Sequence, residues 1–181
     1  IEFSLFYNYI SDLILWQPVF NIWTPINLKE NLARGIELNM SGLAKNSMFQ
    51  IHYKASYSYT KSTIEKIAEN ESENLLHNQL AYVPFHNVST NVSVSYKRIS
   101  LSFISNFVGK RYTDASNLRE LDAYFIGNVN FSYNIEASKF KINTFFKIDN
   151  IWNTNYQSVY LYPNPLRSYE IGFSLNFRKD S

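Results

Sequence analysis

The stretch Tyr169-Glu170-Ile171-Gly172-Phe173-Ser174-Leu175-Asn176-Phe177 decides the fold. Every odd position carries an aromatic or aliphatic side chain, and every even position is polar or glycine. Successive side chains of a β-strand point to opposite faces, so a period of two gives one strand an apolar face and a polar face. The stretch therefore predicts a strand that lies between an apolar and a polar environment.

The same alternation recurs upstream, over residues 49–60, 87–96 and 121–135, with Tyr124 and Ile126 as exceptions in the last of these. Such segments predict eight strands, at about 2–17, 27–44, 47–62, 85–97, 99–112, 119–135, 138–150 and 167–178. Most exceed the roughly 9–11 residues with which a strand crosses a bilayer, whereas strands of soluble proteins have roughly 5–6. The expected fold class is all-β, a transmembrane antiparallel up-and-down β-barrel wall.

The predicted connections alternate between short and long. Short turns are expected at 45–46, 98 and 136–137, and longer loops at 18–26, 63–84, 113–118 and 151–166. Bacterial outer-membrane barrels have short periplasmic turns and long extracellular loops. With the long loops outside, the first strand starts at the periplasm and the last returns there, which places Phe177 near the inner rim.

The composition excludes several classes of protein. The 14 Tyr, 14 Phe and 3 Trp, against 5 Gly and 5 Pro, favour strands and membrane interfaces over loops. There is no cysteine for a disulfide or a thiolate metal site. The net charge of +2 and the lack of a basic run between aromatics exclude a nucleic-acid partner.

No apolar run approaches the roughly 18 residues of a transmembrane helix. Ile1 begins in a patterned segment without initiator Met or signal peptide, which we interpret as a cut.

Chemistry-bearing residues are sparse. His52, His77 and His86 are too dispersed for a metal site, so no metal, no cofactor and no catalytic residue is expected. A pairing of His52 with one of the many serines on its face leaves a lipid hydrolase as a third alternative. The acidic run within 63–84 is interpreted as a solvated loop rather than a cation trap.

Aromatic side chains gather in the predicted loops and at their ends. They either anchor the protein at the membrane interface or stack on a ligand, and anchoring is the commoner use. These aromatic residues are Trp16, Trp23, Trp152, Tyr156, Tyr160 and Tyr162.

Three motifs in the C-terminal third carry a family resemblance. They are Gly109-Lys110-Arg111-Tyr112-Thr113-Asp114, Ile148-Asp149-Asn150-Ile151-Trp152-Asn153 with Tyr156, and Tyr162-Pro163-Asn164-Pro165-Leu166-Arg167. Upstream, Asn31-Leu32-Ala33-Arg34-Gly35-Ile36-Glu37 fits the same pattern. In this order and spacing, the chain resembles the end of a TonB-dependent outer-membrane receptor over essentially all of residues 1–181.

The resemblance implies the last eight strands of a barrel of about 22 strands with a plugged lumen. It implies uptake of a scarce nutrient, such as siderophore-iron, haem or cobalamin, with energy delivered through TonB. Implied partners are outer-membrane lipid, the plug domain and earlier strands, the barrel assembly machinery and a surface lipoprotein. Implied substrate contacts in the loops are Trp23, Arg111, Tyr112, Asp114, Trp152, Tyr156, Tyr160 and Tyr162. The implied assembly signal is Tyr169, Ile171, Phe173, Leu175 and Phe177.

Two departures from the family pattern are present. Pro165-Leu166-Arg167 stands where the family has Pro-Gly-Arg, and residues 178–181 follow the usual terminal Phe. A complete small eight-stranded barrel with a structural or adhesion role, and a soluble sandwich, are the other interpretations. The resemblance is shared by transporters of siderophore-iron, haem, cobalamin, glycans and peptides.

Overall fold

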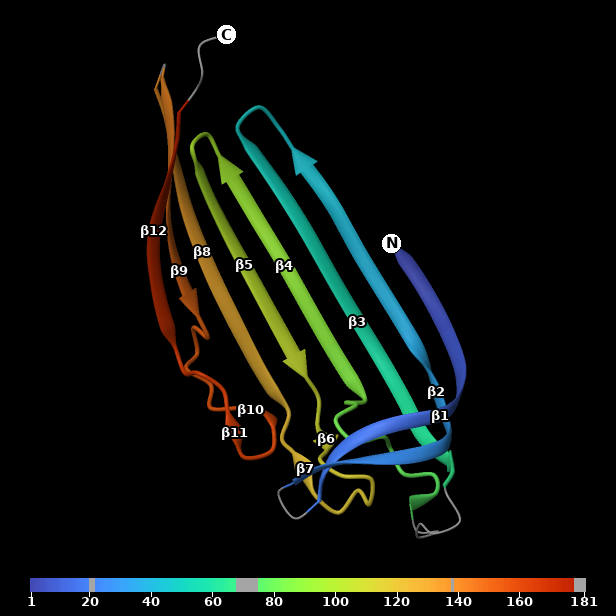
Figure 1. Cartoon of the computed structure of the whole chain (residues 1–181). Helices are drawn as coiled ribbons and strands as arrows, with labels where there is room; N and C mark the ends of the chain where they lie inside the picture. The colour runs from blue at the N-terminus through green and yellow to red at the C-terminus, as the bar shows by residue number, and fades with distance from the viewer. Residues whose placement is uncertain (20–21, 68–74, 138, 178–181) are drawn as a thin grey trace.

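The structure is a computed structural model, which describes residues 1–19, 22–67, 75–137 and 139–177. It is a tall, curved antiparallel sheet with loops gathered at one end and tight turns at the other (Figure 1). The strands are β1 (Glu2–Val19), β2 (Ile22–Lys45), β3 (Phe49–Lys66), β4 (His86–Tyr96), β5 (Ile99–Val108), β6 (Arg111–Tyr112), β7 (Glu120–Leu121), β8 (Tyr124–Glu136), β9 (Phe140–Asp149), β10 (Gln157–Val159), β11 (Tyr162–Pro163) and β12 (Ser168–Phe177).

Eight of these strands form one sheet in the order β1-β2-β3-β4-β5-β8-β9-β12. Neighbours in the sheet are consecutive long strands, each antiparallel to the last, which confirms the up-and-down all-β prediction. In the described part of the chain the sheet is open, with β1 and β12 as its two edges. The sheet is therefore not the closed eight-stranded barrel of the alternative interpretation.

The strand register carries the alternation across the whole sheet. Ile171 lies opposite Phe146, Phe146 lies opposite Phe131, and Phe131 lies opposite Leu101 on the next strand. We call the face that these residues share the apolar face. Its large side chains stand in the open, since Ile171 is 83% exposed. The predicted alternation of β12 is thus present, and it continues in register through the neighbouring strands.

The other face, the polar face, is lined mainly by serine and asparagine. Pairs of serines bond across the strands, with oxygen–oxygen distances of 2.9 Å for Ser93 and Ser102 and 3.0 Å for Ser95 and Ser100. Such cross-strand hydrogen bonds stabilise a sheet by small increments. The polar face therefore satisfies its hydroxyls largely within itself and presents few charges.

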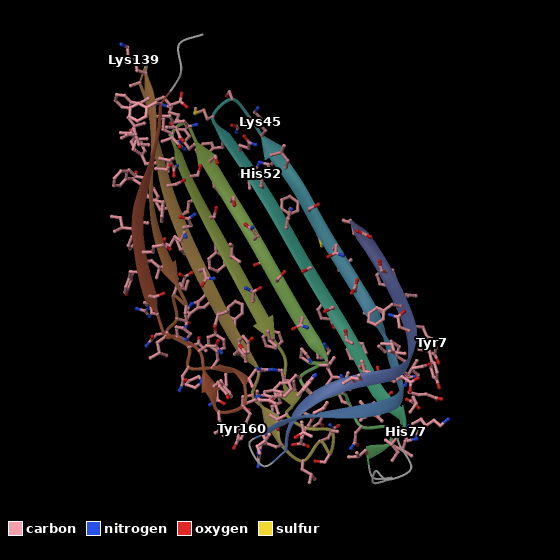
Figure 2. The ribbon with its side chains drawn as sticks, viewed as in Figure 1. Tyr7, Lys45, His52, His77, Lys139 and Tyr160 are labelled. Atoms are coloured by element: carbon pink, nitrogen blue, oxygen red, sulfur yellow. The ribbon has the colours of Figure 1, made fainter. Side chains whose placement is uncertain are left out.

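The tight turns lie where the sequence predicts them, around residues 46–48, 97–98 and 137–139, although residue 138 is outside the described residues. Asn46 stabilises the first turn, since its side-chain oxygen accepts from the N–H groups of Met48 (2.8 Å) and Phe49 (2.7 Å). Figure 2 shows Lys45 and Lys139 at this turn end, with His77 and Tyr160 at the opposite loop end.

The prediction of a long loop over 18–26 is wrong. β1 and β2 stay paired up to Val19 and Ile22, so the connection is a narrow hairpin that curves over the loop end of the sheet (Figure 1). Residues 22–24 are Ile, Trp and Thr, which favour strands, so extension of the hairpin is locally favourable. The bend begins near Asp12, whose φ of 52° is rare for residues other than glycine.

Two other predicted strands are each divided. Residues 99–112 form β5 and β6, and residues 119–135 form β7 and β8. β5 ends where the N–H of Gly109 donates to the carbonyl of His86 (2.8 Å), after which the chain leaves the sheet. A Cβ at Gly109 would lie 2.9 Å from that carbonyl oxygen, so the close approach requires glycine. β6 and β7 then make a separate short hairpin at the loop end.

Candidate functional site

The loop end is a packed layer, which we call the cap, built from residues 13–19, 22–28, 64–67, 75–85, 109–123 and 150–167. Its apolar centre is Leu28, Ile64 and Ala115, each at most 2% exposed. Other partly buried apolar residues pack against this centre, namely Leu13, Ile67, Leu75 and Leu80. The cap thus has a small hydrophobic core of its own, drawn from separate parts of the sequence.

The segment 75–85 joins the cap by adding backbone to the end of β3. The backbone N–H of Ile64 donates to the carbonyl of Asn78 (3.1 Å), and that of His77 donates to the carbonyl of Ile64 (2.7 Å). The N–H of Leu80 donates to the carbonyl of Ser62 (2.7 Å). β3 reaches beyond β4 here and has free backbone groups to offer. The predicted loop 63–84 is therefore partly strand-like, while its acidic residues 69, 71 and 73 lie outside the described residues.

Gln79 and Asn117 lock this segment to the β6–β7 hairpin. The N–H of Gln79 donates to the side-chain oxygen of Asn117 (2.8 Å), and the Asn117 amide donates back to the carbonyl of Gln79 (2.8 Å). Gln79 is 3% exposed, and its own amide also reaches the backbone of Thr60 and Val83. Reciprocal bonds of this kind fix two loops in one relative position.

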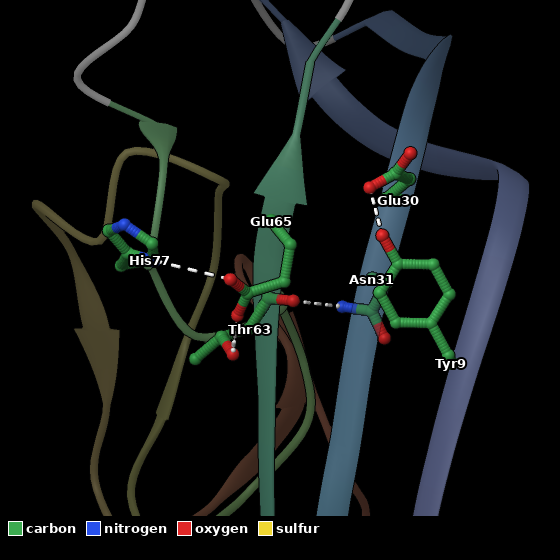
Figure 3. A network of polar contacts seen from close by, with 6 residues as sticks. All are labelled: Tyr9, Glu30, Asn31, Thr63, Glu65 and His77. Carbon is green, nitrogen blue, oxygen red and sulfur yellow. Dashed lines mark hydrogen bonds and ion pairs between the residues drawn. The ribbon is translucent and has the colours of Figure 1, made fainter.

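A polar network, buried at Asn31, Ser62 and Thr63 but exposed at His77, joins β2 to β3 beneath the cap (Figure 3). The Asn31 amide donates to the carbonyl of Thr63 (2.9 Å), and the hydroxyl of Ser62 donates to the Asn31 side-chain oxygen (3.0 Å). The Thr63 hydroxyl donates to Glu65 (2.6 Å), whose other oxygen lies 3.4 Å from Nδ1 of His77. Asn31 is fully buried, and these bonds satisfy both ends of its amide.

Arg111 is a buried cation in the cap, at 4% exposed. Its guanidinium donates to the carbonyls of Gln157, Ser158 (3.4 Å) and Asp122 (3.4 Å), and lies 5.1 Å from the centre of the Tyr124 ring. Burial lowers the pKa of Arg111, although the group stays charged at neutral pH. Arg111 therefore holds the β10–β11 hairpin against the β6–β7 hairpin.

Several tyrosine rings lie next to Arg111 in the cap. The Tyr124 and Tyr156 ring centres are 4.5 Å apart, and the guanidinium of Arg119 lies 4.6 Å from the ring centre of Tyr160. Burial raises the pKa of Tyr156, and the neighbouring Tyr124 raises it further. The Tyr156 hydroxyl is therefore neutral at physiological pH and offers a ring face and a hydrogen-bonding group rather than charge.

A pocket of about 320 Å³ opens beside these rings. Its lining combines aromatic faces with carboxylate and amide groups, a set that can stack on a ligand and hydrogen-bond to it. The lining residues are Glu120, Leu121, Asp122, Ala123, Tyr124, Asn155, Tyr156, Gln157 and Tyr160. The Glu120 carboxylate accepts from Lys110 at 2.5 Å, and this contact raises the pKa of Lys110.

The structure brings some of the predicted substrate contacts together at this pocket. Tyr156 and Tyr160 line it and Arg111 supports it. Tyr112 accepts the N–H of Tyr82 at its carbonyl (2.8 Å), and Asp114 accepts from the N–H of Ser116 (3.0 Å). Tyr112 and Asp114 therefore form hydrogen bonds that stabilise the loops of the cap. The roles of all these residues in binding substrate stay predictions.

Three predicted contacts lie apart from the pocket. The Trp23 ring centre is 6.3 Å from that of Tyr82, at the tip of the β1–β2 hairpin. Tyr162 is exposed on β11. Trp152 lies over Gly127 and stacks on Phe125 (ring centres 4.6 Å apart), two residues of the apolar face. A position over the apolar face suits an interfacial anchor better than a ligand contact.

Tyr124 and Asp122 line the pocket, although the sequence pattern did not predict them as binding residues. Tyr124 interrupts the alternation of residues 121–135, because its ring points to the polar face and lies against Arg111 and Tyr156. An aromatic residue on the wrong face of a regular strand was therefore the available indication. Nothing in the sequence distinguishes Asp122 from other loop carboxylates.

The polar face has two shallow hollows, of about 360 and 490 Å³. Both are lined mainly by the small polar residues of β2 to β5, and they share Asn39, Ser56, Ser89 and Asn106. They offer amide and hydroxyl groups to whatever lies against this face. In the part of the chain that the structure describes, no three His, Asp or Glu gather closely enough to hold a metal ion.

The hydrolase alternative has no structural support in the described residues. Nδ1 of His86 lies 3.0 Å from the Tyr57 hydroxyl, Nε2 of His52 lies 2.6 Å from the Gln50 amide, and His77 faces Glu65. None of the three pairs with a serine in that part of the chain. The same residues include no helix long and apolar enough to cross a membrane.

An antiparallel wall of long strands, apolar on one side and polar on the other, with tight turns at one end and packed loops at the other, defines the class of bacterial outer-membrane barrels. Residues 1–151 match the family model described as TonB dependent receptor-like, beta-barrel. The chain therefore belongs to the TonB-dependent receptor β-barrel family.

Individual relatives agree with this assignment. The vitamin B12 transporter BtuB of Photobacterium profundum is 26% identical over an alignment of 165 residues, which covers 88% of this chain and 25% of that protein. The fold is that of BauA, the ferric preacinetobactin receptor of Acinetobacter baumannii (TM-score 0.74, 19% identity, 96% of this chain and 26% of that one). Fiu, the ferric-catecholate import receptor of E. coli, is similar (TM-score 0.67, 15% identity, 97% and 25%). The chain spans about a quarter of each relative.

Proposed function

We propose that this chain forms the last eight strands of a TonB-dependent transporter of about 22 strands in the outer membrane of a Gram-negative bacterium. The whole protein takes up a scarce nutrient such as siderophore-iron, haem or cobalamin. Energy reaches it through TonB. The observation that carries the proposal is the open wall itself, with one apolar and one polar face and two unpaired edges.

The height of the apolar face supports a membrane position. From Phe49 to Tyr59 β3 advances ten residues, about 34 Å along the strand at the usual rise. With the usual tilt of an outer-membrane strand, this length gives a band about 25 Å high, the height of the hydrocarbon layer there. Outer-membrane lipid is thus the partner of the apolar face.

The open edges support a larger barrel. Unpaired N–H and C=O groups in hydrocarbon cost several kcal/mol each, so an edge in a membrane requires a neighbouring strand. Earlier strands of the same receptor pair with β1, and β12 closes the barrel against the first of them. The plug domain fills the lumen and lies against the polar face, where the two hollows offer hydroxyls and amides.

The cap supports a role in substrate uptake. Its pocket presents Tyr124, Tyr156 and Tyr160 beside Glu120 and Asp122 on the side of the polar face, where substrate would enter a lumen. The remaining proposed partners act elsewhere. The barrel assembly machinery recognises the odd positions of β12, from Tyr169 to Phe177, and a surface lipoprotein contacts the loops.

An uptake assay tests the proposal. The full-length receptor is expressed in a Gram-negative host that lacks its own receptors for iron carriers and cobalamin, with and without TonB. We expect uptake of one labelled nutrient from a panel of ferric siderophores, haem and cobalamin, and loss of that uptake without TonB. Uptake that persists without TonB would contradict the energy source, and failure of the protein to reach the outer membrane would contradict the location.

A further inference from the structure

Two cations face each other at the loop end of the apolar face. Arg34 of β2 lies directly opposite Lys61 of β3, and the pair shares the face of Ile36 and Tyr59. Arg34 is exposed and Lys61 is partly exposed. Among the described residues neither forms an ion pair with a carboxylate. Like charges directly opposite on neighbouring strands destabilise a sheet, so this arrangement favours an anion from outside the chain.

The height of the pair is set by the apolar band. On β3 the band ends at Tyr59, and Lys61 is the next residue on the same face. On β2 it ends at Ile36, and Arg34 is the next. Tyr7 of β1, labelled near the loop end in Figure 2, lies opposite Arg34, and Tyr59 precedes Lys61 on the same face of β3. In the proposed membrane position both cations therefore lie at the level of the lipid headgroups on the loop side.

The chemistry of the pair selects phosphate. A guanidinium binds two oxygens of one phosphate, and an ammonium adds a point charge. The acyl chains of a lipid that carries this phosphate would lie along the apolar face towards the turn end, beginning at Ile36 and Tyr59. We propose that Arg34 and Lys61 form a binding site for the phosphate groups of a lipid in the loop-side leaflet. The inference rests on the proposed membrane position of the sheet.

A lipid-retention experiment tests the site in the full-length receptor. The protein is purified in detergent, incubated with bisphosphorylated lipid A or with its dephosphorylated form, and examined by native mass spectrometry. Arg34→Gln/Lys61→Gln is the test variant. Lys45→Gln/Lys54→Gln is the matched control, because it removes the same charge from the same two strands at positions away from the cation pair.

We expect the wild type and the control to retain bisphosphorylated lipid A, and the test variant to bind it about tenfold more weakly. Excess inorganic phosphate should not displace the lipid, since the acyl chains add apolar contact. Equal binding by both double variants, equal binding of the dephosphorylated lipid, or displacement by free phosphate would each overturn the inference.

Heat-modifiable gel mobility separates this result from the proposed function. If the barrel folds in detergent but the two double variants bind bisphosphorylated lipid A equally, only the lipid site is contradicted. A protein that stays in solution without detergent contradicts the membrane position, and the lipid site with it.

Discussion

The wall around β4 and β5 and the cap segment 75–85 are neighbours in sequence, yet different interactions stabilise them. In the wall, each residue bonds to a strand next to it, and its side chain meets the same environment as the side chains two positions away. In the cap, Gln79 bonds to Asn117 and Asn78 bonds to Ala115, partners that are 38 and 37 residues away. A wall of this kind follows from a local repeat, whereas a cap depends on particular distant pairs.

The largest expected effect comes from a charge on the apolar face of the wall. Val92 lies mid-way along β4, opposite Tyr53 and Phe103. In the full-length barrel, Val92→Arg should lower the free energy of unfolding by about 2–4 kcal/mol, because an arginine at the bilayer midplane is poorly solvated. Ser93→Arg, one residue away on the polar face, should cost much less. A folding titration in lipid vesicles that gave equal losses would contradict the assignment of the two faces.

A smaller and local effect is expected in the cap. The Ile64 side chain is fully buried with Leu28 and Ala115, so Ile64→Ala leaves a cavity at the centre of the cap. We expect a loss of about 2 kcal/mol, at the low end for such a substitution because loops can settle into the space. Hydrogen exchange should quicken at the amides of His77 and Leu80. Equal quickening along β5 would show that the wall and the cap unfold together.

The smallest effect concerns one hydrogen bond. Asn117→Asp keeps the oxygen that accepts from the Gln79 N–H but replaces the amide that donates to the Gln79 carbonyl. We expect the cap to lose about 1 kcal/mol, measured by hydrogen exchange at Leu80. Asn91→Asp on the polar face is the control, because the Ser93 hydroxyl can still donate to it. Equal hydrogen-exchange rates at Leu80 in the two variants would contradict a stabilising role for the hydrogen bonds of Asn117.

The alternation predicted the wall because each face of a strand has one environment along its whole length. It misplaced the end of the first hairpin, since pairing from Ile22 to Ile26 continues where the alternation gives no guide. Tyr124 broke the alternation for a reason that lay 32 residues later, in the ring of Tyr156. The cap could not be predicted, because its contacts join segments whose sequences carry no common period.

Cysteine labelling along β12 in the full-length receptor, in intact membranes, tests the central claim most directly. Single cysteines replace residues 168–177 in turn and react with a water-soluble maleimide and with a membrane-restricted reagent. We predict that 169, 171, 173, 175 and 177 react mainly with the membrane-restricted reagent, and that 168, 170, 172, 174 and 176 do not. The same labelling at odd and even positions, or preference of the odd series for the water-soluble reagent, would contradict the membrane wall.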